Sequence, residues 1–300
     1  MASAREIQDR IKSINDTKKI TSAMYLISSS KLKRARKALA DTEPYFYTLQ
    51  STIAKILKNT DSEQTRQRYF EESLTKPVDQ RRRAYIVVTA DKGLAGAYNH
   101  NVIKIAEQQV INNPNSKLYV VGQVGMHYFE HKNIKSDHNF HYTIQNPTLN
   151  RARNIAETLL DAYLKKKVDE VYIIYTKMIN SMSSEAEMLQ LLPLVKEDFS
   201  EEKLHKKDDR KIEFEFFPSP NAVFENIVPN WISGLIYGAL VESYCSEQNS
   251  RMMAMQASTD SANEMLRDLN IKFNRVRQAA ITQEITEVIS GAKAQKNKKN

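Results

Sequence analysis

The chain has 300 residues, with 44 Lys and Arg against 36 Asp and Glu, which is enough for one or two domains with an apolar core. Its single cysteine, Cys245, excludes an internal disulfide and fits a small core residue, and no apolar run is long enough to span a membrane. Both ends are basic, with ten bases against three acids in residues 1–40 and seven against two in residues 271–300. Such ends suit a solvated helix face, an anionic partner or a nucleic acid.

Residues 1–57 are predicted to form a long helix whose apolar side chains repeat in heptads. The repeat runs from Ile7 to Ile56 at alternating spacings of three and four residues, which is typical of a coiled coil. Pro44 is a candidate position for a kink. In the middle of the repeat, the same register places polar or partly polar side chains: Lys18, Thr21, Tyr25 and Ser28.

The middle of the chain is predicted to be an α/β domain of Rossmann-like type over residues 84–195. Apolar, β-branched segments alternate with helical ones, which favours a mostly parallel sheet. Polar segments flank this domain, a linker at 58–83 and a connecting loop at 196–218. The predicted strands are 84–90, 117–122 and 168–177, and the clearest helix is 150–167.

A second long helix is predicted for residues 219–294, followed by a basic tail at 295–300. Ser219 can cap this helix, with Pro220 at its first position. Gly234 and Gly238 are spaced for close contact with a neighbouring helix. Two terminal helices of similar length most simply pair antiparallel, so the fold class expected is a long antiparallel coiled coil with a central α/β domain.

No catalytic, cofactor or metal site emerges from the residues. The segment 89–101 follows a strand and carries Gly93 and Gly96, but a third glycine is absent, so a tight turn is the simpler interpretation than a dinucleotide site. No P-loop sequence occurs, so any nucleotide in the system must be bound by another chain. Four nearby histidines lack a metal-protease spacing and are expected at the surface: His127, His131, His138 and His141.

Three segments resemble the γ subunit of F-type ATP synthase. They are the long runs 4–39, 241–265 and 274–294, and the turn at 89–101 is similar as well. The bacterial forms fit best, since no organelle targeting segment precedes the first helix. The resemblance implies a non-catalytic rotor shaft of a proton-translocating synthase. Its partners would be the α and β subunits, the ε subunit and the c-ring, at the cytoplasmic face of the cell membrane, without nucleic acid or cofactor.

The resemblance also assigns residues to partner contacts. Lys18 and Met24 would lie near acidic lever segments of the β subunits, and Arg10 and residues 31–37 would add positive charge along the shaft. Three further residues would hydrogen-bond a β-subunit loop: Arg277, Gln278 and Thr282. At Ala95 many relatives carry cysteine, so a thiol role at that turn is not expected here.

Two other functions stay open on the residues alone. The chain could be a coiled-coil scaffold that binds a different anionic partner, or an enzyme that uses a nucleotide in residues 84–195. A nucleic-acid role is disfavoured because Tyr25 is the only aromatic residue within residues 1–40, which leaves no stacking surface beside the charge.

Overall fold

The computed structural model describes residues 4–59, 68–70, 76–77, 80–180, 183–200 and 217–297. Much of the predicted linker, most of the predicted loop and the last residues of the predicted tail lie outside these ranges. The chain divides into two compact units, each described by itself: residues 1–27 with 251–300, and residues 28–250.

Two long helices supply parts of both units. Helix α1 spans Ala4–Asn59 and continues through Pro44, and helix α6 spans Pro220–Asn297 and continues through Pro229. The helix expected from Ser219 onward is confirmed at its start, because the Ser219 hydroxyl accepts a hydrogen bond from the backbone N–H of Ala222 at 3.2 Å. Every predicted seam position of α1 from Ile7 to Ile56 is buried or half-buried, so the heptad register is correct.

The unit formed by residues 28–250 contains a four-stranded sheet of order β2-β1-β3-β4. Strand β1 pairs in parallel with β2 and β3, whereas β4 pairs antiparallel with β3 at the edge. The predicted three parallel strands are confirmed, and β4 was not predicted. The bounds are β1 Arg83–Val88, α3 Tyr98–Asn112, β2 Lys117–Val121, α4 Gln123–His131, α5 Leu149–Leu164, β3 Glu170–Met178, β4 Ser184–Leu192 and the short 3-10 helix η3 Lys196–Phe199.

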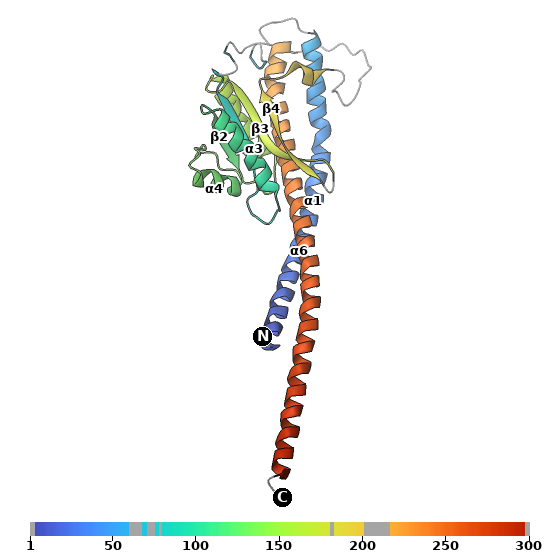
Figure 1. Cartoon of the computed structure of the whole chain (residues 1–300). Coiled ribbons are helices and arrows are strands. Elements are labelled where there is room, and N and C mark those ends of the chain that lie inside the picture. Colours follow the sequence, from blue (N-terminus) through green and yellow to red (C-terminus); the bar gives the residue numbers. More distant parts are fainter. Residues whose placement is uncertain are drawn as a thin grey trace. The chain divides into compact units, whose positions relative to one another are not determined.

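Alternate residues of the strands point to two apolar cores. Tyr85 and Val87 face α3 and α4 on one side of the sheet. Ile86 and Val88 face the other side, where α5 and the inner parts of α1 and α6 pack. Figure 1 shows α1 and α6 running side by side along the sheet. The helices are therefore part of the core of this unit.

Close packing of α1 on α6 within this unit depends on one glycine. A Cβ atom added to Gly234 would overlap the ring of Phe46, which lies directly against the α6 backbone. Gly238 has no neighbouring atom within 4 Å of such a Cβ atom. The expectation of a glycine-mediated helix contact is thus confirmed at Gly234 and wrong at Gly238.

Candidate partner-contact surfaces

The polar interruption of the α1 seam lies inside the helix pair. In the unit formed by residues 1–27 and 251–300, Thr21 is 7% exposed and its Oγ1 lies 2.7 Å from Oγ1 of Thr259 on α6. Each hydroxyl also lies near a carbonyl of its own helix. Thr21 Oγ1 is 3.0 Å from the Lys18 carbonyl oxygen, and Thr259 Oγ1 is 2.9 Å from the Met255 carbonyl oxygen. One hydroxyl therefore donates to the other, and the second donates to its own helix. This arrangement satisfies both groups and keeps the two backbones close.

Lys18 and Met24 both lie on α1 and are half-buried. Met24 stands between two exposed apolar residues, Ile20 at 61% and Ile27 at 54% exposure, at spacings of four and three residues. This spacing gives α1 an apolar stripe outside the seam. Ile20 and Ile27 were not predicted, because they lie outside the heptad seam; with Met24 they follow an i, i+4, i+7 spacing that is visible in the sequence.

The C-terminal part of α6 carries the other three predicted contact residues, Arg277, Gln278 and Thr282. All three side chains are exposed, and from 277 to 292 no described side chain is buried. The Thr282 hydroxyl donates to the Gln278 carbonyl at 2.9 Å, which leaves its oxygen able to accept from a partner. Exposed apolar residues share this stretch: Ile281, Ile285, Val288 and Ile289.

The five predicted contact residues form two zones instead of one site. Thr259 marks the point on α6 beside the Lys18–Met24 zone of α1. Arg277 lies about 27 Å farther along α6 at a rise of 1.5 Å per residue. A partner surface must therefore be extended, or two partner elements must contact the two zones separately.

Three other features that the sequence raised as candidate sites show no catalytic or metal-binding arrangement among the described residues. The turn after β1 is tight, with Gly96 at φ 57°, and Asn99 Oδ1 accepts the Ala90 N–H at 2.8 Å. The four histidines are exposed, and the described ranges hold no group of three His, Cys, Asp or Glu side chains suited to a metal. Cys245 is buried, and burial raises the pKa of its thiol to about 11, as expected for a core residue.

None of the described helices is both long enough and apolar enough to cross a bilayer.

Comparison with known proteins identifies the family. The family model described as ATP synthase matches residues 3–295. The ATP synthase gamma chain of Ruminiclostridium cellulolyticum is 45% identical over 97% of this chain and 98% of its own length. The chain belongs to the ATP synthase gamma chain family. Gamma chains are non-catalytic subunits of that complex, which agrees with the expectation drawn from the sequence.

Two further relatives match over almost the whole chain, and one of them has an ion in its name. The gamma chain of Acetivibrio thermocellus is 42% identical over 99% of this chain and the whole of its own length. The Acetobacterium woodii protein, named as sodium ion specific, is 34% identical over 97% of this chain and 98% of its own.

Solved structures share the fold at lower identity. A chain of the Euglena gracilis mitochondrial ATP synthase matches with a TM-score of 0.61 at 16% identity, covering 99% of this chain and 96% of that chain. A chain of the Tetrahymena thermophila central stalk and c-ring matches with a TM-score of 0.58 at 23% identity, covering 79% of this chain and 98% of that chain. The expected fold, two long terminal helices and a central α/β domain, is thereby confirmed.

Proposed function

We propose that this gamma chain is the rotor shaft of a bacterial ATP synthase, in which rotation of the c-ring drives the catalytic β subunits through their nucleotide-binding states. The observation that supports this role is the stretch of α6 from 277 to 292, where four apolar side chains are exposed and no described side chain is buried. Exposed apolar side chains on a single helix lower the solubility of a protein. A partner that surrounds the helix would bury them.

The partners follow from this role. The outer parts of α1 and α6 would lie within the ring of α and β subunits, with Lys18 and Met24 near β-subunit levers. Arg277, Gln278 and Thr282 would hydrogen-bond a β-subunit loop. The unit that carries the sheet would contact the ε subunit and the c-ring at the cytoplasmic face of the membrane, with one copy of the chain per complex. The six-segment division expected from the sequence, from the helix at 1–57 to the basic tail at 295–300, belongs to the same proposal.

Affinity purification of the tagged full chain from its own cells tests the assignment. We expect α, β and ε subunits to co-purify in fixed ratio, and the chain alone to show neither ATP hydrolysis nor nucleotide binding. Turnover by the purified chain would instead support the enzyme alternative. Recovery of another acidic protein in place of α and β would support the scaffold alternative.

A further inference from the structure

A pocket of about 320 Å³ lies in the unit formed by residues 28–250, away from the Lys18–Met24 and Arg277–Thr282 zones, although Lys31 and Arg34 in its wall belong to the range 31–37 expected to add charge along the shaft. Helix α1, helix α6 and the loop that precedes α5 form its walls. This volume is at the lower end of the range for small-molecule sites. The lining residues are Lys31, Arg34, Ala35, Ala38, Asn146, Pro147, Val241 and Tyr244.

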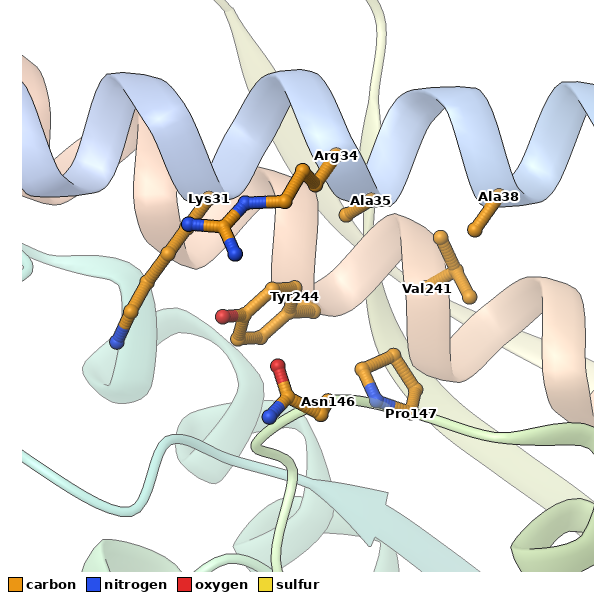
Figure 2. Close-up of a pocket in the computed structure, with 8 residues that line it drawn as sticks. All are labelled: Lys31, Arg34, Ala35, Ala38, Asn146, Pro147, Val241 and Tyr244. Atoms are coloured by element: carbon orange, nitrogen blue, oxygen red, sulfur yellow. The ribbon is translucent and has the colours of Figure 1, made fainter.

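The two ends of the pocket differ in chemistry. Figure 2 shows the polar groups of Lys31, Arg34, Asn146 and Tyr244 gathered at one end. The other end is apolar and is formed by a second set of lining residues: Ala35, Ala38, Pro147 and Val241. A ligand that fits this division has an anionic group at one end and an apolar body at the other.

The two cations at the polar end are available to a ligand. Among the described residues neither Lys31 nor Arg34 forms an ion pair, and Arg34 donates a single hydrogen bond, to Ser30 Oγ at 3.3 Å. A guanidinium and an ammonium together suit a doubly charged group with several acceptor oxygens, such as a phosphate monoester, better than a singly charged carboxylate.

The loop wall of the pocket is fixed before any ligand binds. Asp91, which follows β1, accepts hydrogen bonds from the backbone N–H groups of Ile144 at 3.1 Å and Gln145 at 3.2 Å. Arg151 donates to the Gln145 carbonyl at 2.9 Å, and Asn146 adopts a φ of 47°, which few residue types tolerate. Asp91 follows β1, so this loop lies near the carboxyl end of that strand. Strand β1 lies between β2 and β3, where the strand order reverses, and ligands of α/β folds bind at such points.

We propose that this pocket binds a small phosphate monoester with an apolar or aromatic body. The phosphate contacts Lys31 and Arg34, and the body lies against Ala38 and Val241. Such a ligand bridges α1, α6 and the loop before α5, so it stabilises the packing of the two helices against the sheet unit. This inference does not depend on the rotor role.

Calorimetric titration of the full chain with phenyl phosphate tests the site. We expect saturable binding that is weakened at least about tenfold in the Lys31→Gln/Arg34→Gln double variant, since two charge-assisted contacts are lost. Lys33→Gln, which removes a charge from an exposed position of α1 outside the pocket, should leave the affinity unchanged. No saturable binding, or equal weakening by Lys33→Gln, would overturn the proposal.

Four further titrations distinguish the two ends of the pocket. Inorganic phosphate and benzoate should each bind more weakly than phenyl phosphate, because the first lacks the body and the second lacks the double charge. Ala38→Leu fills the apolar end, so it should weaken phenyl phosphate while leaving inorganic phosphate unchanged. If inorganic phosphate or benzoate binds as tightly as phenyl phosphate, the assignment of the two ends is wrong.

Discussion

The hydroxyls of Thr21 on α1 and Thr259 on α6 lie 2.7 Å apart, at the point where the heptad seam turns polar. Two threonines in this position are smaller than the leucines of an ordinary seam, so the helices approach closely without a bulky apolar contact. Under the proposed shaft role, this hydrogen bond would hold the helix pair together, and the exposed apolar stripe at Met24 would be left for partner subunits.

Replacing Thr21 by Val should destabilise the helix pair only moderately. Thr259 keeps an acceptor in the Met255 carbonyl at 2.9 Å, so the loss is about 1 kcal/mol, that of one neutral hydrogen bond. Urea unfolding of the purified chain measures it. Thr17→Val is the control, because Thr17 is exposed and bonds only within its own helix, to Ser13. An equal loss in both variants would show that the cross-helix bond contributes nothing.

Gly234→Ala and Gly238→Ala should change stability in opposite directions. A methyl group at 234 overlaps the Phe46 ring, and we expect a loss of about 1–3 kcal/mol despite the better helix propensity of alanine. At 238 the same change meets open space, and propensity alone should add about 0.5–1 kcal/mol. The measurement is the midpoint of thermal unfolding. If both variants are stabilised, α1 and α6 are not in close contact at Phe46.

Asp169 at the start of β3 should make stability depend on pH in the acid range. Burial alone would raise the pKa of this carboxyl, but hydrogen bonds from the side chain and backbone of Arg82, and from Lys76, outweigh burial and hold the pKa well below its usual value of 3.8. Because the folded state has the lower pKa, the stabilisation is present above the usual pKa and is lost as the pH falls through it toward the folded value.

Asp169→Asn should therefore lose about 2 kcal/mol at neutral pH, less than a fully buried pair because Arg82 and Lys76 are 38% and 42% exposed. The variant should also show a shallower fall in the free energy of unfolding below about pH 4. Urea unfolding at a series of pH values measures both effects. Asp161→Asn, which breaks an exposed pair with Lys165, is the control and should change stability by less than about 0.5 kcal/mol. Parallel pH profiles for wild type and Asp169→Asn would contradict this account.

Arg277→Ala/Gln278→Ala should leave the isolated chain folded, since both side chains are exposed. In the assembled complex we expect ATP synthesis to fall about tenfold. A few residues usually carry most of the binding energy of an interface, and Arg277 and Gln278 are proposed to be such residues. The measurements are ATP synthesis in membrane vesicles and circular dichroism of the chain. Lys272→Ala, an exposed change on another face of α6, should have little effect. Unchanged synthesis in the double variant would refute the contact role.

Much of the fold could be predicted from the sequence because the heptad repeat of apolar residues continues over many turns of helix. The heptad register of α1 holds from Ile7 to Ile56, and Ser219 marks the start of α6 through its hydroxyl. Strand β4 was missed because its sequence, SEAEMLQLL, contains no β-branched residue and favours a helix locally. Pairing with β3 overrides that preference, and such a tertiary effect is not visible in one segment.

The contact zones were predictable only in part. Arg277, Gln278 and Thr282 came from resemblance, and the structure adds that they share an exposed stretch with Ile285. The pocket between α1, α6 and the loop before α5 could not be predicted, because only the path of that loop places Asn146 in the same pocket as Lys31. Gly238 was misjudged because glycine spacing does not reveal where the opposite helix has a large side chain.

Rotation of the chain inside its own complex tests the central claim most directly. A fluorescent probe can be attached at Ile111→Cys, an exposed position at the end of α3, in a Cys245→Ala background, and the α and β subunits fixed to a surface. With ATP we expect the probe to turn stepwise in one direction, at a rate that follows ATP hydrolysis. Normal hydrolysis with a stationary probe would contradict the rotor account.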